Sequence, residues 1–212
     1  MRKKWCWATG WLFAFGMWTI AVCCMDVSSI GPNGSVVGFA TINAWFHNRT
    51  GVHMTLYTIT DWLGLVPVAV CVVFAMLGVC QWIARKRLRY VDSDILILGG
   101  FYIVTIAAYL LFESVVINYR PILIAGYLEA SYPSSTTLLV LCVMPTALWQ
   151  VKKRIRRPVA RCCVVTVMVA FTIFMVVGRL LSGVHWLSDI IGGVLCGMGL
   201  VSLYDACCCR VK

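Results

Sequence analysis

GRLLSGVHWLSD, residues 178–189, joins the last two apolar runs of the chain and places an arginine, a histidine and an aspartate at spacings of six and four. If the final run is helical from Trp186 onward, His185 and Asp189 lie on one face, one turn apart. A carboxylate in that position can hold an imidazole in one tautomer and stabilise its positive charge, as catalytic histidines require. Arg179 carries a planar fork of donors that suits phosphate oxygens. The segment therefore predicts a phosphate-handling site at the mouth of a hydrophobic helix.

The composition is typical of a membrane protein. Of 212 residues, 61% are hydrophobic and 12% are charged, whereas a soluble domain carries about 25% charged residues. Six apolar runs approach or exceed the roughly 18 to 20 residues that cross a bilayer as a helix. We therefore predict an all-α integral membrane protein with six transmembrane helices in a single domain over residues 1–212. The runs are Trp5–Met25, Trp62–Ala84, Ile95–Phe112, Ser135–Val151, Val159–Leu181 and Trp186–Tyr204.

The net charge of +10 is concentrated in a few places. Fifteen of the eighteen Lys and Arg residues lie at the N-terminus, after the second and fourth runs, and at the C-terminus. With six spans these places share one side of the membrane, which the positive-inside rule makes cytoplasmic. We therefore expect a multi-pass protein of the cell membrane with both termini in the cytoplasm, and we interpret the charge as an orientation signal with some attraction to anionic lipid. No nucleic-acid partner is expected. The remaining arginines, Arg49, Arg120 and Arg179, fall on the outer side.

The longest segment between apolar runs covers residues 26–61 and is predicted to be an outer loop. Its apolar residues between Val36 and Phe46 can form one side of a short helix lying on the membrane surface. Such a helix would border an entrance for lipid, or serve as a lid or packing element.

The twelve cysteines indicate neither a disulfide scaffold nor a metal site. Cys71, Cys80, Cys142 and Cys196 lie well inside apolar runs, where a thiol behaves as a small apolar group. Two clusters, Cys162-Cys163 and Cys207–Cys209, lie near the inner face, which is reducing in most cells. No histidine accompanies them, so neither a metal nor another cofactor is expected. We expect packing at the membrane boundary, with acylation as the alternative.

The predicted topology places five polar residues together on the outer face. Ionisable groups in or beside the membrane are energetically costly, which makes them candidates for function. The alternative is a cluster of salt bridges that ties the helices together. A transporter of small solutes would carry such charges nearer the middle of the membrane. The five residues are Arg120, Ser134, Arg179, His185 and Asp189.

Three segments of residues 113–189 form an ordered set of motifs. They are Glu113-x6-Arg120-Pro121, Pro133-Ser134-Ser135-Thr136 and Gly178-Arg179-x5-His185-x3-Asp189. This set resembles the type 2 phosphatidic acid phosphatase family, the membrane phosphatases of lipid phosphates and diphosphates. That family carries Lys-x6-Arg-Pro, Pro-Ser-Gly-His and Ser-Arg-x5-His-x3-Asp in the same order. The resemblance covers residues 62–205.

The resemblance implies a nucleophile and a phosphate pocket. His185 would attack phosphorus and become a phosphohistidine, with Asp189 orienting the imidazole. Arginines would take the place of a cation, so no metal would be required, and the substrate would be a membrane lipid phosphate. The phosphoryl oxygens would be held by Arg120, Arg179, Ser134 and backbone N–H groups near Ser135 and Thr136.

Two positions depart from the family's pattern. Glu113 replaces a phosphate-binding lysine, and a carboxylate there repels a phosphate dianion unless it pairs with an arginine, turns away or takes up a proton. Thr136 replaces the histidine that protonates the leaving oxygen, which contributes about 100- to 10,000-fold in rate. An alkoxide needs that proton, whereas a lipid monophosphate, with a second pKa of roughly 6, is a weak base. We therefore expect a lipid diphosphate such as a polyprenyl diphosphate, with phosphatidate as the family's broader substrate.

Two other functions use the same residues. A catalytically degenerate relative would bind lipid phosphates without hydrolysing them, and Glu113 and Thr136 favour that alternative. A lipid phosphotransferase would pass the phosphoryl group from the phosphohistidine to another acceptor.

Overall fold

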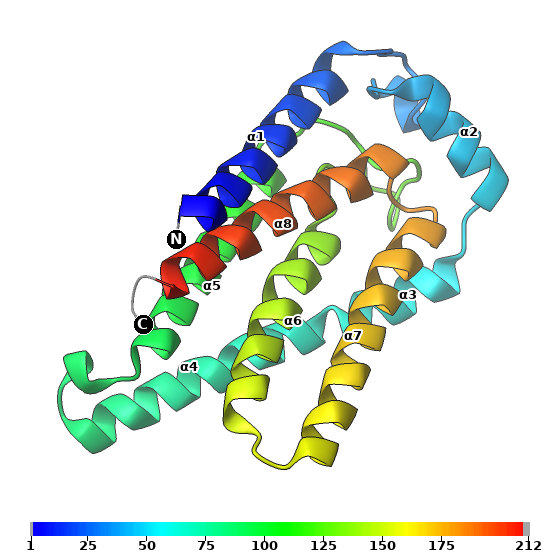
Figure 1. The fold of residues 1–212 in the computed structure, drawn as a ribbon. Coiled ribbons are helices and arrows are strands. Elements are labelled where there is room, and N and C mark those ends of the chain that lie inside the picture. Colours follow the sequence, from blue (N-terminus) through cyan, green and yellow to red (C-terminus); the bar gives the residue numbers. More distant parts are fainter. Residues whose placement is uncertain (1, 210–212) are drawn as a thin grey trace.

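The computed structural model describes residues 2–209 and is all-helical (Figure 1). Within that range, extended pairing is limited to three isolated bridges. Two short 3-10 turns, Pro32–Gly34 and Leu88–Tyr90, interrupt the connections. The helices are α1 (Arg2–Cys24), α2 (Ala40–Thr50), α3 (Met54–Leu63), α4 (Leu65–Arg85), α5 (Ser93–Ser114), α6 (Ser135–Arg154), α7 (Pro158–Leu181) and α8 (Leu187–Cys208).

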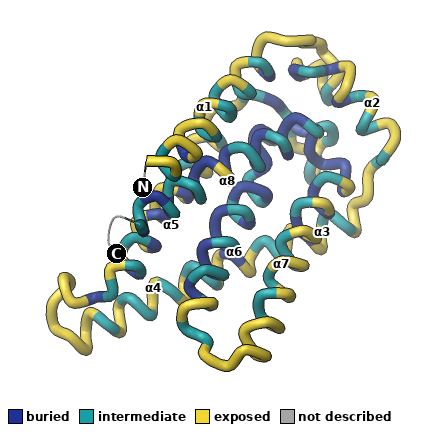
Figure 2. Tube along the Cα trace, in the orientation of Figure 1, coloured by how far each residue is buried: buried dark blue, intermediate teal, exposed yellow. Residues whose placement is uncertain are grey.

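Five stretches of this structure are long and apolar enough to cross a membrane: α1, α3 with α4, α5, α7 and α8. The protein is therefore a multi-pass membrane protein. The remaining predicted run, Ser135–Val151, forms α6, which contains Pro145 and ends in three basic residues. Polar side chains of α6 such as Thr146 and Gln150 are buried against neighbouring helices, and Figure 2 shows α6 and α8 as the most buried parts of the bundle. Because protein rather than lipid covers much of α6, its sequence is less apolar.

The helical segment that contains the second apolar run is longer than the predicted run. The candidate span covers Met54–Arg85, whereas the predicted run is Trp62–Ala84. Gly64 lies between α3 and α4 with helical dihedral angles, so the two helices follow each other without a loop. Asp61, which directly precedes the predicted run, lies 3.4 Å from Arg179.

Helix α8 is the centre of the bundle. It packs most extensively against α1 and α6 and also contacts α2, α5 and α7. Two glycines of α8 allow the close approach, because a Cβ atom on Gly197 or Gly199 would overlap Leu141 of α6 or Leu12 of α1. Between these helices lies the larger hydrophobic core, which contains Leu98, Phe101, Leu138, Val143, Cys196 and Leu200.

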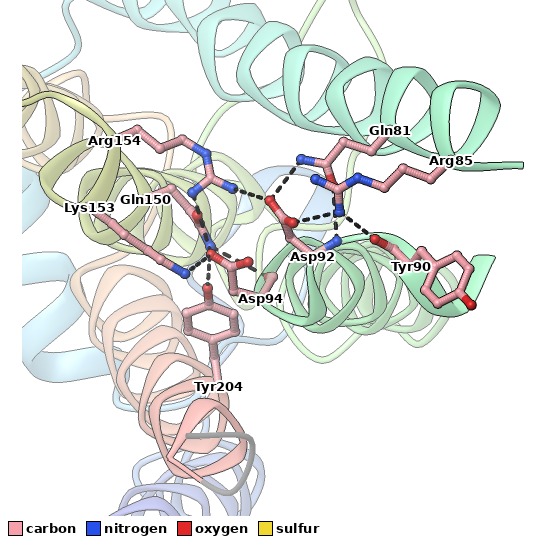
Figure 3. A network of polar contacts seen from close by, with 9 residues as sticks. All are labelled: Gln81, Arg85, Tyr90, Asp92, Asp94, Gln150, Lys153, Arg154 and Tyr204. Atoms are coloured by element: carbon pink, nitrogen blue, oxygen red, sulfur yellow. Dashed lines mark hydrogen bonds and ion pairs between the residues drawn. The ribbon is translucent and has the colours of Figure 1, made fainter. Parts of the chain in front are cut away.

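An ion-pair network connects helices at the end of the bundle opposite residues 178–189 (Figure 3). Asp92 lies 2.8 Å from Arg85 of α4, and Asp94 lies 2.8 Å from Lys153 and 3.4 Å from Arg154 of α6. Several basic residues that the sequence analysis assigned to membrane orientation therefore also join helices.

Gly183 fixes the connection between α7 and α8. Its φ is +71°, and a Cβ atom there would lie 2.1 Å from the carbonyl oxygen of Gly51. Gly126 has a φ of +85° and no neighbouring atom within 4 Å of the same position. Both positions share the free-energy cost that a left-handed backbone imposes on a side chain, and only Gly183 adds the cost of close approach. Comparing the two therefore distinguishes these costs.

We expect Gly183→Ala to lower the thermal stability of the protein in detergent much more than Gly126→Ala. Each alanine adds about 1–2 kcal/mol for the left-handed conformation, and only Gly183→Ala also forces two backbone segments apart. The measurement is the unfolding temperature of the two purified variants, and equal temperatures would contradict the assigned close approach.

Candidate active site

The carboxylate of Asp189 is fully buried in the first turn of α8. Its Oδ2 accepts a hydrogen bond from the backbone N–H of Trp186 at 2.9 Å, which caps the helix. Its Oδ1 accepts one from the Asn118 amide at 3.2 Å. A buried carboxylate is costly unless its lone pairs are satisfied, so these donors hold Asp189 in one orientation.

His185 lies immediately before this helix and is also buried. Its Nδ1 is 3.9 Å from Asp189 Oδ2, an ion-pair distance that exceeds a hydrogen bond. Neither ring nitrogen has a hydrogen-bond partner among residues 2–209. Burial lowers the pKa of His185 well below its ordinary value, the charges of Arg120 and Arg179 lower it further, and the Ser131 backbone opposes them. The imidazole is therefore neutral at neutral pH, as a nucleophile requires.

The two predicted phosphate-binding arginines lie over one aromatic ring. The guanidinium carbons of Arg179 and Arg120 are 5.0 and 6.0 Å from the ring centroid of Tyr57, on α3. Each arginine also has a carboxylate neighbour: Arg179 Nη1 is 3.4 Å from Asp61 Oδ1, and Arg120 Nε is 3.1 Å from Glu129 Oε2. Sequence reasoning missed all three of these neighbours, because they come from α3 and from the loop before α6.

A short hairpin carries Arg120. The backbone N–H of Arg120 donates to the Glu129 carbonyl at 3.0 Å, and that of Ser131 donates to the Asn118 carbonyl at 2.9 Å. At the tip, Ala125 and Gly126 have positive φ and make a tight turn. The hairpin is fastened to α8 because the indole N–H of Trp186 donates to the Tyr119 carbonyl at 2.7 Å. The only sequence signal for it was the glycine at the turn.

The second motif starts helix α6. The backbone N–H of Ser134 donates to the Asp189 carbonyl at 3.1 Å, so the first turns of α6 and α8 are joined. The hydroxyl of Ser134 is buried and has no hydrogen-bond partner in the described chain. Ser135 and Thr136 follow in the first turn, where backbone N–H groups lack intrahelical partners and suit an anion. Ser135 and Thr136 are half-buried.

Glu113 lies beside residues of the second motif. It is exposed near the end of α5 and lines a small crevice with Ser131 and Ser135. Among residues 2–209, the ion pairs of Arg120 and Arg179 are made by Glu129 and Asp61 rather than by Glu113. Of the three arrangements that make a carboxylate compatible with phosphate here, pairing with an arginine is therefore not observed among the described residues.

Helix α2 supports the start of α8 as well. Within the predicted loop, α2 presents Asn43, whose amide donates to Ser188 Oγ at 2.9 Å and whose oxygen accepts from the Ser188 N–H at 3.1 Å. The Trp18 indole of α1 donates to the Ser188 carbonyl at 3.1 Å. The start of α8 is therefore held by α1, α2 and the hairpin together.

Buried donors without partners gather on the three motif segments. They are Arg120 Nη1, Arg179 Nε and the Ser134 hydroxyl, and the two ring nitrogens of His185, of which one is a donor in the neutral imidazole, likewise have no partner among residues 2–209. An unsatisfied buried donor costs about 1–3 kcal/mol, and more when charged, so such a group of donors indicates a ligand that accepts hydrogen bonds. Two arginines make that ligand an anion. In the described part of the chain, no group of three His, Cys, Asp or Glu residues could hold a metal ion.

We expect Arg120→Gln to raise the pKa of His185, because it removes one of the two nearby positive charges. In the wild type, the folded protein binds fewer protons than the unfolded chain near the ordinary value of 6.5, so the free energy of unfolding should fall as pH drops through that value. Nitrogen chemical shifts of the imidazoles in protein labelled at its histidines measure the titration. Arg49→Gln, a change at an exposed arginine, is the control and should leave the His185 resonance unchanged.

Comparisons with known proteins agree with this geometry. Residues 100–207, which are 108 of the 212 residues and include all three motif segments, match the sequence model of the PAP2 superfamily. Among solved structures, the chain is similar to a transmembrane PAP2-type phosphatidylglycerolphosphate phosphatase from Bacillus subtilis, with a TM-score of 0.56 and 16% identity over 97% of this chain and 98% of that chain. No curated protein sequence matches significantly. The solved structure shows a shared fold, and the family match shows that the chain belongs to the PAP2 superfamily.

Proposed function

We propose that this protein is a phosphatase of membrane lipid phosphates with six transmembrane helices, both termini in the cytoplasm and its site on the outer face. The family supports the activity. The distribution of basic residues supports the orientation, because the clusters after α4 and α6 lie at the end of the bundle opposite the motif residues. In this arrangement α6 is the fourth of the six spans along the chain and is surrounded mainly by protein.

One observation carries the proposal: buried donors of Arg120, Arg179 and Ser134 lie without partners within the described residues, and so do the ring nitrogens of His185. Structural salt bridges between helices would leave such donors satisfied, and the paired network at the opposite end does so. A phosphoryl group supplies several acceptor oxygens and negative charge for this set. Positioning and charge stabilisation of this kind provide most of the catalysis in phosphoryl transfer.

His185 acts as the nucleophile. Its Nδ1 faces Asp189, so Nε2 is the nitrogen left for the substrate. Attack forms the N–P bond while the P–O bond to the leaving lipid breaks, and the leaving oxygen keeps the electron pair. Asp189 stabilises the charge that develops on the imidazole, once the 3.9 Å separation shortens to a hydrogen bond. Water then cleaves the N–P bond and releases inorganic phosphate.

The substrate is a lipid diphosphate. Thr136 cannot protonate a leaving oxygen at neutral pH, and the exposed Glu113 makes no ion pair with either arginine. A leaving lipid monophosphate needs no such proton because it is a weak base. A polyprenyl diphosphate fits this requirement better than phosphatidate, whose leaving group is an alkoxide.

We expect His185→Ala to abolish phosphate release and Asp189→Asn to lower the rate by about 100- to 10,000-fold. The assay is phosphate release from a panel of lipid mono- and diphosphates by purified protein. His53→Ala is the matched control, because that exposed histidine lies before α3 and should be dispensable. Turnover by folded His185→Ala protein would exclude the phosphohistidine mechanism.

Restoring the family's histidine should change the substrate preference. We expect Thr136→His to raise the ratio of monophosphate to diphosphate turnover by about tenfold, the lower part of a general-acid effect. Glu113→Gln tests the other departure, since it removes the titratable proton with little change in size. If Glu113→Gln selectively lost activity on phosphatidate, Glu113 would be the acid and the diphosphate preference would be wrong.

A further inference from the structure

Tyr57 is the one residue in the described chain whose ring lies beneath both phosphate-site arginines. It sits on α3, which lies outside residues 100–207 and outside the three motifs. Its guanidinium neighbours come from different places, Arg179 from the last turn of α7 and Arg120 from the hairpin. Tyr57 therefore connects α3 to the two segments that carry the phosphate-site arginines.

Helix α3 is held against α7 at the residue before Arg179. A Cβ atom on Gly178 would lie 2.8 Å from Cγ2 of Thr60, so only glycine allows the observed approach. The family motif has serine at this position, whereas this chain has Gly178 beside Arg179. The glycine thus brings the α3 surface that carries Tyr57 up to the arginine.

Two guanidinium groups close together repel each other, and burial of Arg179 strengthens that repulsion. Their carboxylate neighbours offset it only partly, since the side chains of Asp61 and Glu129 are 55% and 40% exposed and exposed ion pairs contribute little. An aromatic ring has a negative face that attracts a cation. The ring of Tyr57 offers this attraction to both arginines without occupying their N–H donors.

We infer that Tyr57 is a positioning residue that holds Arg120 and Arg179 side by side, with their free donors available to one phosphoryl group. The inference rests on the proposed phosphate site but not on turnover. The ring rather than the hydroxyl positions the arginines, because both guanidinium groups contact the ring face.

The test is binding of orthophosphate to purified protein, followed by the rise in unfolding temperature at constant ionic strength. We expect Tyr57→Phe to bind like the wild type and Tyr57→Leu to need about tenfold more phosphate, as expected for the loss of two cation–π contacts. Trp62→Leu is the matched control, because it removes a 70%-exposed aromatic ring from the same helix and should leave binding unchanged. In an active enzyme, Tyr57→Leu should raise KM more than it lowers kcat.

Several results would overturn the inference. They are unchanged phosphate binding by Tyr57→Leu, equal loss in Tyr57→Phe and Tyr57→Leu, or a wild type that does not bind orthophosphate. Failure of the proposed phosphatase function would give a different experimental result. A wild type that hydrolyses no lipid phosphate yet binds orthophosphate in a manner that requires the Tyr57 ring would refute the phosphatase and support the positioning role.

Discussion

The buried carboxylate of Asp189 is the constraint on which the motif-bearing end of the structure depends. It caps α8 through the Trp186 N–H and holds the hairpin through Asn118. The backbone carbonyl of the same residue accepts from Ser134 at the start of α6. A charge removed from water must have its lone pairs satisfied, so the residue that faces His185 also brings the three motif segments together.

The charged residues differ between the two ends of the bundle. At the end opposite the motifs, Asp92 and Asp94 pair with basic residues of α4 and α6, and the charges neutralise one another. At the end that carries the motifs, Arg120 and Arg179 each have a carboxylate neighbour but also keep buried donors without a partner among residues 2–209. The first arrangement joins helices, and the second is suited to an anionic ligand. The presence or absence of partners therefore distinguishes charged residues that join helices from those suited to a ligand better than charge or burial alone does.

Helix α3 links the family's motifs to a part of the chain that lies outside them. Gly178 lets α3 approach α7, Asp61 lies beside Arg179, and Tyr57 contacts both arginines. The arginines are therefore held from a helix that precedes the region matching the family model. The geometry of the phosphate site depends on this packing as well as on the motif residues.

The sequence by itself determined the helical membrane character, because bilayer thickness sets the length of an apolar run, and it determined the motif positions along those runs. It also placed His185 and Asp189 one turn apart, since their spacing of four matches the helical repeat. Only the tertiary structure decided that a helix begins at Met54 and continues into the second apolar run, and that Glu129 and Asp61 rather than Glu113 neighbour the arginines in the described chain. It likewise decided that Tyr57 meets both cations. Spacing along a helix follows from local geometry, whereas these contacts join residues far apart in sequence and depend on how the helices pack.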